Sequence, residues 1–348
     1  MSNFFATTLS TSPHVKDQRS VPYIMRHVVY ATLPLVGFAF WNFGWSALLV
    51  VATTSFFCVL SEGIFNLLTG RASSVGDYSA LITGILLGLT LPPAFPLWMA
   101  AVGSIFAIII GKAIFGGLGH NPFNPALVGR AFLQAAFPAA ITTWSIPQAP
   151  QRFASLLPST LAFPFSTPNL DGSAGATPLA LQKFSQTASP WQDLFVGTSA
   201  GSLGETSALL ILLCGLYLAL RKFLDWRIPL GILATVAIFS GILHLVNPNF
   251  ASPLAAIFSG GLMLGAFFMA TDMVSSPVLP RATWIYAVFI GILVVVIRIW
   301  GGLPEGVMYA ILLGNAISPQ LNRLIKSTPY GHGNKAGHGN KAGQGSKA

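Results

Sequence analysis

Ten apolar runs alternate with short polar hinges along the chain. Each run has between 15 and 22 residues, close to the roughly 20 that an α-helix needs to cross the hydrocarbon core of a bilayer. The pattern therefore predicts an all-α polytopic membrane protein with about ten transmembrane helices. The approximate bounds of the runs are 27–41, 44–65, 79–93, 96–115, 123–141, 205–220, 228–246, 253–271, 283–300 and 305–321.

The third and eighth runs are interrupted. Pro92 and Pro93 cut the third run short, and the eighth contains a Gly–Gly pair and ends in Asp272. The segment 82–88 (ITGILLG) aligns with 259–265 (SGGLMLG) at an offset of 177 residues, and 115–118 (FGGL) aligns with 300–303 (WGGL) at an offset of 185.

These two ordered matches predict an internal duplication of five helices each. Because five is odd, the two copies must insert with opposite topology, as in transporter-like inverted repeats with interrupted helices at the midplane. The alternative is that Gly-rich apolar helices resemble one another by chance.

The repeats divide the chain into five segments. They are an N-terminal segment (1–25), a first five-helix repeat (26–141), a loop (142–204), a second five-helix repeat (205–325) and a tail (326–348). The loop is rich in Ser, Thr, Pro and Ala. The tail ends in three Gly/Lys-rich hexads (331–348) that cannot bury apolar area, so it is expected to be disordered.

Composition supports membrane insertion. Hydrophobic residues make up 53% of the chain and charged residues only 8%, against about 25% charged in soluble domains. The formal charge of +9 does not indicate nucleic-acid binding, because the basic residues lie mostly in short hinges and in the tail. Their positions instead predict the orientation of the chain in the membrane.

Ten spans with both termini in the cytoplasm place most of the basic residues inside. Only Arg152, Lys183 and Arg298 then fall on the outer side, together with the 142–204 loop. The residues expected inside are Lys16, Arg19, Arg26, Arg71, Lys112, Arg130, Arg221, Lys222, Arg227, Arg281, Arg323, Lys326, Lys335, Lys341 and Lys347.

Two kinds of polar residue near the spans are candidates for function. Acids near the bilayer interior are costly and usually functional, so Asp272 and Glu305 are candidates for an ion path. Asn121 and Asn124, in the segment NPFNP, offer amide donors and acceptors suited to an uncharged ring system. A simpler interpretation is that NPFNP caps a broken helix. Glu62 is interpreted as a solvated residue beside a hinge.

Four segments resemble a known family. They are GGLGHNPFNPALVGRAFL (116–133), DGSAGATPLA (171–180), FMATDMVSSP (268–277) and GGLPEGVMYAILLGNAISP (301–319). In this order they resemble the D subunit of the Rnf complex, the ion-translocating ferredoxin:NAD oxidoreductase. The resemblance covers roughly residues 20–325. The B subunit of the sodium-pumping NADH:quinone reductase is the next relative and remains an alternative.

The resemblance implies a covalent FMN, linked through its phosphate to a threonine by a dedicated flavin transferase. The transferase signature D-x-x-(S/T)-G-A-T is similar to residues 171–177, with Asp171, Gly175 and Ala176 preceding the acceptor Thr177. Ala174 departs from the signature, which weakens the transfer prediction but leaves the acceptor hydroxyl in place. Pro178 favours an extended backbone at Thr177, which would present that hydroxyl outward. The family also implies a non-covalent riboflavin, which we assign to Asn121 and Asn124.

The function implied is a flavin-carrying subunit of a redox-driven ion pump, not catalytically complete alone. It would relay electrons between ferredoxin and NAD and couple this to Na⁺ or H⁺ translocation. The expected setting is the bacterial inner membrane, where membrane lipid and other subunits with iron–sulfur centres and flavins would be its partners. A urea- or ammonium-type channel without flavin and a structural anchor of a redox complex remain alternatives.

Overall fold

The computed structural model describes residues 20–164, 174–187, 189–197 and 199–325. Almost all regular structure in these residues is helical. Asp171 of the proposed transferase signature, the tail and most of the N-terminal segment lie outside the described residues. The longer elements are α1 (Val21–Phe43), α2 (Trp45–Leu68), α3 (Ser79–Leu89), α4 (Leu97–Ile108), α5 (Pro125–Ala136), α9 (Ala208–Leu220), α10 (Arg227–Val246), α13 (Pro280–Trp300) and α14 (Val307–Leu324).

Short elements complete the chain. They are η1 (Val75–Asp77), η2 (Ile109–Ala113), α6 (Pro138–Ile141), β1 (Trp144–Ser145), β2 (Ala174–Gly175), α7 (Pro178–Phe184), α8 (Trp191–Val196), α11 (Pro253–Phe258), α12 (Leu262–Leu264) and η3 (Gly265–Met269). Each of the ten predicted apolar runs coincides with a helix or with a broken helix. Four helices in the described part of the chain, α1, α2, α10 and α13, are long and apolar enough to cross a membrane, which makes the protein a multi-pass membrane protein.

The third and eighth runs are interrupted where the sequence predicted. Helix α3 has only 11 residues and ends before the Pro92–Pro93 pair. The eighth run divides into α11, α12 and the π-helical segment η3, and the break falls at Gly260, whose φ of +64° is a conformation that favours glycine.

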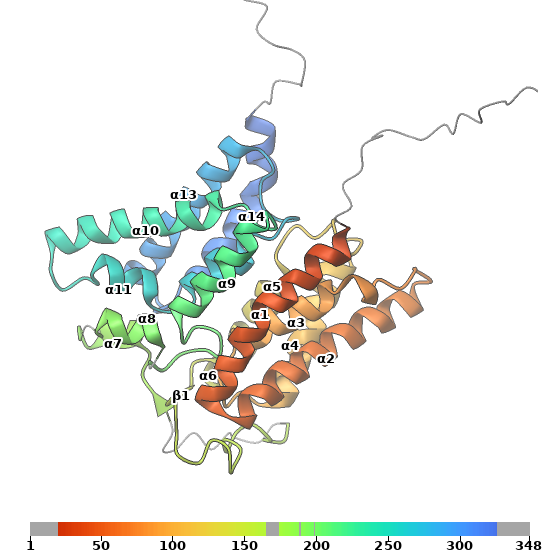
Figure 1. Ribbon diagram of the computed structural model, residues 1–348, viewed down its shortest axis with the longest axis horizontal. Helices are drawn as coiled ribbons and strands as arrows, with labels where there is room; N and C mark the ends of the chain where they lie inside the picture. The colour runs from red at the N-terminus through yellow and green to blue at the C-terminus, as the bar shows by residue number, and fades with distance from the viewer. Residues whose placement is uncertain (1–19, 165–173, 188, 198, 326–348) are drawn as a thin grey trace, which may run out of the picture.

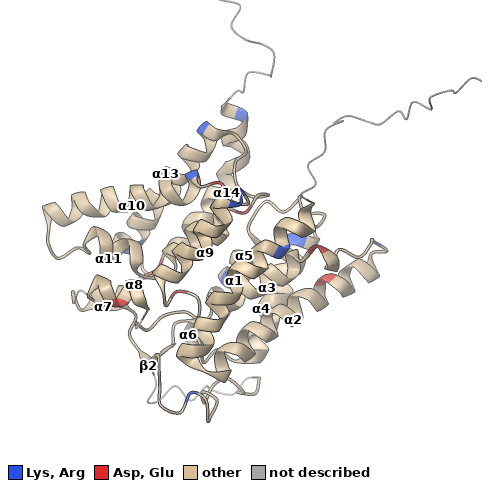
Figure 2. Ribbon diagram, viewed as in Figure 1, with Lys and Arg blue, Asp and Glu red and all other residues tan. Residues whose placement is uncertain are grey.

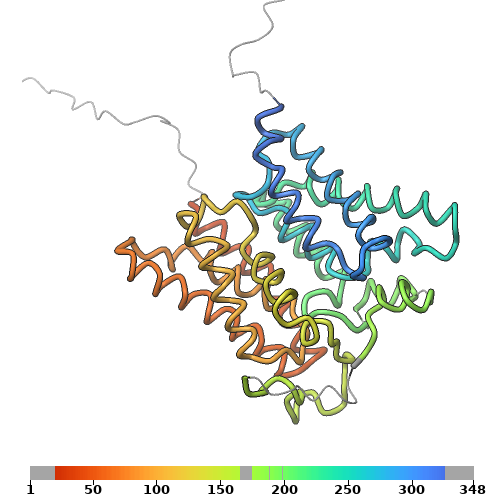
Figure 3. The backbone as a smooth tube through the Cα atoms, turned by 180° about the vertical axis from the view of Figure 1, so that it is seen from behind, coloured from red at the N-terminus to blue at the C-terminus, as the bar shows by residue number. Residues whose placement is uncertain are grey.

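The helices form two groups that lie side by side (Figure 1). The first group consists of α1 to α5 and the second of α9 to α14, and the view from behind shows the same division (Figure 3). The neighbours within each group correspond. Helix α2 packs on α4 as α10 packs on α13, α4 packs on α5 as α13 packs on α14, and α1 meets α9 across the boundary.

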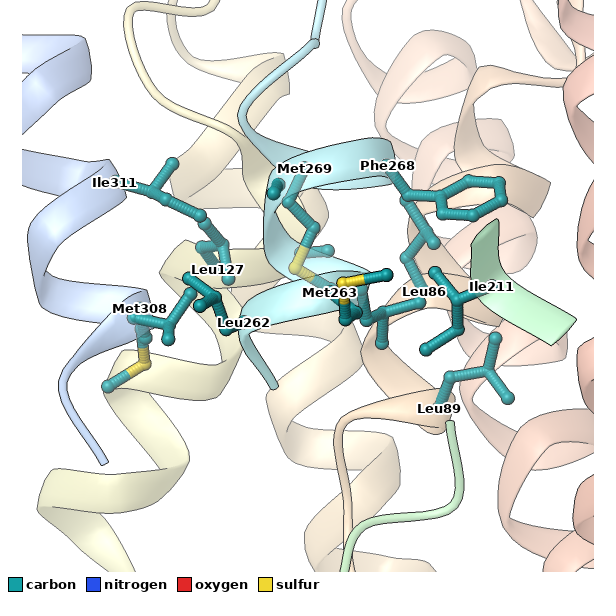
Figure 4. Close-up of a cluster of buried hydrophobic side chains, with 14 of the residues drawn as sticks. Leu86, Leu89, Leu127, Ile211, Leu262, Met263, Phe268, Met269, Met308 and Ile311 are labelled. Carbon is teal, nitrogen blue, oxygen red and sulfur yellow. The ribbon is translucent and has the colours of Figure 1, made fainter. Parts of the chain in front are cut away.

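Apolar side chains from both groups meet in one core (Figure 4). Leu86 and Leu89 of α3 lie close to Ile211 of α9, and Leu127 of α5 lies close to Ile311 of α14 (Figure 4). The interrupted segment α12–η3 passes between them and contributes four further side chains, Leu262, Met263, Phe268 and Met269 (Figure 4). The broken helices therefore lie at the seam between the groups.

The segment between α6 and α9 covers one end of the helices (Figure 1). Strand β1 pairs antiparallel with β2, which places Trp144 opposite Gly175. Two hydrogen bonds hold the segment against the turn between α1 and α2. Gln148 N donates to Asn42 O at 2.8 Å, and Arg152 Nε donates to Trp41 O at 2.9 Å.

The start of α1 and the end of α14 lie at the opposite end of the molecule (Figure 1). Most of the basic residues drawn in Figure 2 also lie toward that end. Two residues of the predicted cytoplasmic set do not behave as hinge charges, however. Lys112 and Arg130 are buried in ion pairs inside the helical domain, so they carry no information about orientation.

Candidate cofactor sites

Thr177 lies at the start of α7, immediately after the β1–β2 pair. Its backbone is extended, with φ of −70° and ψ of 152°, and its hydroxyl oxygen accepts a hydrogen bond from Ala180 N at 3.2 Å. Pro178 is the first residue of the helix, a position that proline favours. The side chain is therefore the N-cap of α7 and is half-buried.

A cavity of about 340 Å³ opens beside Thr177, and we call it the Thr177 cavity. This volume is within the range of roughly 300–1,000 Å³ that is common for small-molecule sites. Gly175, Ala176 and Thr177 line one side, and the aromatic rings of Trp144 and Tyr309 line others. The cavity therefore joins the segment 174–180 to helix α14 and to the loops at the seam.

A charged cluster forms the inner wall of the Thr177 cavity. Arg130 of α5 donates from Nη2 to Glu305 Oε2 at 2.9 Å and from Nη1 to Glu205 Oε1 at 3.3 Å. The side chains of Arg130 and Glu205 are 9% and 5% exposed, and that of Glu305 is 19% exposed. One guanidinium thus faces two carboxylates directly, and the buried Arg298 lies close enough to act on both, which offsets their remaining negative charge.

Gly261 brings the two carboxylates close to the interrupted helix. Its backbone N–H donates to Glu305 Oε1 at 2.7 Å. A Cβ at this position would come within 2.5 Å of Glu305 Oε1 and 2.7 Å of Glu205 Oε1. A larger residue at this position would therefore require both carboxylates to move, which gives the predicted Gly–Gly pair a structural reason.

A second, narrower cavity of about 90 Å³ is lined by Asn121, Asn124, Asp272 and Lys112, and we call it the Asn121 cavity. Asn121 Nδ2 donates to Phe123 O at 3.0 Å and lies 3.4 Å from Asp272 Oδ2. Its Oδ1 is buried and has no hydrogen-bond partner among the described residues. Asp272 also accepts from Val274 N and Ser275 Oγ, at 3.3 and 3.0 Å.

Both polar atoms of the Asn124 side chain form hydrogen bonds within the protein. Its Oδ1 accepts from Ala126 N and Leu127 N at 3.0 and 3.3 Å, which makes it the N-cap of α5. Its Nδ2 donates to Met269 O of η3 at 3.1 Å. The capping interpretation of NPFNP explains Asn124, and Pro125 is the first residue of α5.

Lys112 and Glu62 form a buried ion pair beside the Asn121 cavity. Lys112 Nζ donates to Glu62 Oε1 at 2.7 Å and to Ser79 Oγ, and the two side chains are 2% and 5% exposed. Ser74 Oγ donates to the same Glu62 oxygen at 2.6 Å. The interpretation of Glu62 as a solvated hinge residue is therefore wrong, because it is the counter-ion that allows a lysine to be buried in the π-helical turn η2.

The two cavities differ in how well they suit a flavin. The Thr177 cavity has the volume, the aromatic walls and a hydroxyl at its edge. The Asn121 cavity offers an unpartnered amide oxygen, but its 90 Å³ is well below the volume of common small-molecule sites. As it stands, a three-ring isoalloxazine does not fit there.

The structure thus separates the predicted site residues into two groups. Gly175, Ala176, Thr177 and Glu305 lie at the Thr177 cavity, and Asn121, Asn124 and Asp272 lie at the other. The sequence pattern did not single out Glu205 or the role of Arg130. The contacts of Arg130 with Glu205 and Glu305 join residues far apart in the chain. The only sequence feature that could have indicated Glu205 is its position as an acid at the predicted start of the sixth run.

Comparisons with known proteins decide the family. The model of the NQR2, RnfD, RnfE family matches residues 8–331. The chain belongs to this family.

Three curated relatives of the NQR2, RnfD, RnfE family cover nearly the whole chain. A protein of Alcanivorax borkumensis, named as the D subunit of an ion-translocating oxidoreductase complex, is 41% identical over 93% of this chain and 96% of its own length. The D subunit of the Na⁺-translocating ferredoxin:NAD⁺ oxidoreductase complex of Acetobacterium woodii is 42% identical over 93% and 95%. The proton-translocating counterpart of Clostridium ljungdahlii is 39% identical over 93% and 96%.

Proposed function

We propose that this protein is the D subunit of an ion-translocating ferredoxin:NAD⁺ oxidoreductase and carries a covalent FMN on Thr177. The relatives' names and their coverage of both chains support the complex. The observation that supports the cofactor is the position of Thr177, whose hydroxyl lies at the edge of a cavity of suitable volume. The protein is a translocase subunit that needs iron–sulfur and flavin subunits to complete the electron path.

The residues around Thr177 would hold the cofactor in defined ways. Gly175 and Ala176 carry little side-chain bulk, so a flavin transferase can approach the backbone before the acceptor. Trp144 and Tyr309 provide aromatic surfaces against which a flat ring can pack. Bound in this cavity, a flavin supplies one- and two-electron transfer, and the protein sets its position and electrostatic surroundings.

The Arg130–Glu205–Glu305 cluster supplies a site for charge compensation. Two carboxylates side by side in a buried place favour uptake of a proton by one of them, although the nearby Arg298 offsets part of their charge. Glu205 Oε2 is the most weakly bonded carboxylate oxygen, since its polar contact is Ser202 N at 3.5 Å. We therefore assign a transferable proton to Glu205 Oε2, with Arg130 holding the carboxylate in place.

The proposed coupling ion is Na⁺ or H⁺. Relatives named for Na⁺ and for protons are 42% and 39% identical to this chain, so overall identity does not distinguish them. Glu305 and Asp272 remain the proposed ion-path acids. Asp272 lies in the second cavity beside Asn121, where its carboxylate has no basic partner within ion-pair distance among the described residues.

Riboflavin at the Asn121 cavity remains a separate proposal, to which we assign no electron-transfer step. Asn121 Oδ1 is the atom available to accept a hydrogen bond from a ring N–H. The cavity would have to widen, and Phe267 and Phe268 of η3 are the lining side chains with the most bulk to displace. Asn121→Leu should lower the non-covalent flavin recovered after acid extraction and leave covalent flavin unchanged.

The arrangement of the helices supports the inverted repeat and the orientation proposed from the sequence. Corresponding helices in the two groups have corresponding neighbours. The interrupted segments α3 and η3 both line the Asn121 cavity at the seam. Both ends of the described chain lie at the end of the molecule opposite α7, the helix that Thr177 caps (Figure 1). We propose that this end is cytoplasmic and that Thr177 is extracytoplasmic, in the bacterial inner membrane.

Attachment is tested on the tryptic peptide 153–183 of the chain purified from membranes. The peptide should carry the mass of FMN, less water, on Thr177, and the denatured protein should fluoresce in a gel. Thr177→Val should abolish both signals, whereas Thr187→Val, in the same segment, should keep them. A colourless wild-type chain from cells with an active flavin transferase would contradict the cofactor proposal. It would favour the channel or anchor alternatives.

A further inference from the structure

A third cavity lies next to the Thr177 cavity but belongs to neither proposed flavin site. Its volume is about 270 Å³, and it is enclosed by α7, the ends of α10 and α13, and the turn that leads into α11. We call it the Arg298 cavity. Leu179 and Pro304 line both this cavity and the Thr177 cavity, so the two are neighbours.

Arg298 is buried at this cavity and makes no direct ion pair with a carboxylate among the described residues. It is 9% exposed and donates from Nη1 to Ala256 O at 2.6 Å and from Nη2 to Ser259 O at 2.8 Å. Its Nε is buried and has no hydrogen-bond partner among the described residues. Glu305 and Glu205 lie close enough for their negative charge to act on Arg298, but the two oxygens of Glu305 accept from Gly261 and Arg130. An arginine that keeps an unused donor in such a place indicates a missing acceptor.

Lys183, near the end of α7, adds a second positive charge. Its ammonium donates to the carbonyl oxygens of Gly301 and Leu303, which leaves one of its three N–H groups unused. Burial lowers the pKa of the Lys183 ammonium, since no anion compensates for the lost solvent. No Asp or Glu is among the described residues that line the cavity. The cavity is therefore complementary to an anion.

The remaining walls suit an aliphatic chain. Val236 and Leu243 of α10 and Val295 and Ile299 of α13 line the cavity. The neighbouring surface of α10 is also apolar, and Ile242 and Leu245 there are 55% and 86% exposed. On the other side the cavity has an amide rim that includes Gln182, Asn247 and Asn249.

We propose that the Arg298 cavity binds one anionic phospholipid. The phosphate group lies at Lys183 and in the positive field of Arg298, and an acyl chain lies along α10 and α13. A free inorganic anion would use the positive charge but none of the apolar wall, whereas a neutral lipid would leave Lys183 without an anion. Lipids are the amphiphiles that a membrane-spanning chain meets at high concentration, and basic pockets between membrane helices are known to select anionic headgroups.

Binding there has a structural consequence for the neighbouring site. Helix α7 begins at Thr177 and carries Lys183 near its end. A phospholipid held between Lys183 and the α10–α13 pair therefore fastens the helix that bears Thr177 to the membrane domain. This inference needs the cavity and its charges but does not need a flavin on Thr177.

Native mass spectrometry of the full-length chain tests the proposal. The chain is stripped of lipid in detergent and then titrated with phosphatidylglycerol, with phosphatidylcholine or with inorganic phosphate. We expect one phosphatidylglycerol per chain that survives collisional removal of detergent. Phosphatidylcholine should bind at least fivefold more weakly. Equal retention of the two lipids would overturn the proposal, as would inorganic phosphate that competes fully with phosphatidylglycerol.

Variants locate the lipid. Lys183→Gln should weaken retention of phosphatidylglycerol at least fivefold, and Ala251→Trp should fill the cavity and abolish it. Lys222→Gln removes an exposed lysine from the other end of the helices and should leave retention unchanged. Unchanged binding in both cavity variants would refute the assignment. Loss of the lipid in Thr177→Val would show instead that a group on Thr177 forms this site.

Discussion

Arg130 and Glu305 form an ion pair at 2.9 Å across 175 residues of chain. Arg130 comes from the last helix of the first group, and Glu305 precedes the last helix of the second. The pair therefore joins the two groups at the wall of the cavity that contains Thr177. Glu205, from the segment that connects the groups, bonds to the same guanidinium.

Removing Arg130 should be strongly destabilising. Arg130→Met leaves two buried carboxylates without a counter-ion, and breaking a buried pair costs roughly 3–5 kcal/mol. A large fall in Tm of the detergent-solubilised chain should follow, and adding Glu205→Gln and Glu305→Gln should recover part of it. The control is Arg227→Met, which breaks the half-exposed pair with Asp225 at 3.8 Å and should change stability by about 1 kcal/mol at most. Equal effects of the two single variants would contradict the importance of the cluster.

Gly261→Ala should disturb the same cluster from the other side. The added Cβ would lie within 2.5 Å of Glu305 Oε1, so the carboxylate must move away from Gly261 N. We expect lower thermal stability and a lower yield of assembled protein. Gly37→Ala is the matched control, since nothing lies within 4 Å of its Cβ and alanine favours the helix by about 0.5–1 kcal/mol. A Gly261→Ala protein as stable as Gly37→Ala would show that the acids have room to rearrange.

Lys112 and Glu62 should behave as a unit. Lys112→Met alone leaves Glu62 buried and without a cation, which costs roughly 3–5 kcal/mol. Lys112→Met combined with Glu62→Leu removes both charges and should regain most of the lost stability. The thermal unfolding of the two single variants and the double variant gives the coupling energy directly. Additive losses would mean that each residue is held by other contacts.

Asn124 should matter first as a helix cap. Asn124→Ala removes the acceptor for two amides at the start of α5, and loss of an N-cap costs about 0.5–2 kcal/mol. It also leaves Met269 O without its donor. Asn124→Ser keeps a hydroxyl acceptor for the cap and loses the contact with Met269. Thermal unfolding should therefore rank the variants as wild type, Ser and Ala in falling stability, and a reversed order of Ser and Ala would exclude capping as the main role.

The sequence predicted the helical segments and their interruptions well. The apolar runs located the helices because burial in lipid or in the core demands apolar residues along the whole span. Pro92 and the Gly260–Gly261 pair located the breaks, since proline ends a helix and glycine accepts the positive φ found at Gly260. These are local signals that each segment carries by itself.

The buried charges could not be placed in the same way. The count of basic residues on each side of the membrane assigned Arg130 and Lys112 to the cytoplasmic side, because a residue at the edge of an apolar run is expected to face water. Both are instead neutralised by acids that lie 75, 175 and 50 residues away in the chain. A single sequence carries no record of such pairs, so Glu205 remained unnoticed beside the predicted Glu305.

The hydroxyl oxygen of Thr177 has two roles. Its Oγ1 accepts the hydrogen bond that starts α7, and the same oxygen is the point at which a phosphate ester would form. An esterified oxygen is a poorer acceptor, so loading and capping compete. The amide of Ala180 should then exchange with deuterium faster in modified chains than in unmodified ones. The rate of exchange at that single amide would report the fraction of chains that carry FMN on Thr177.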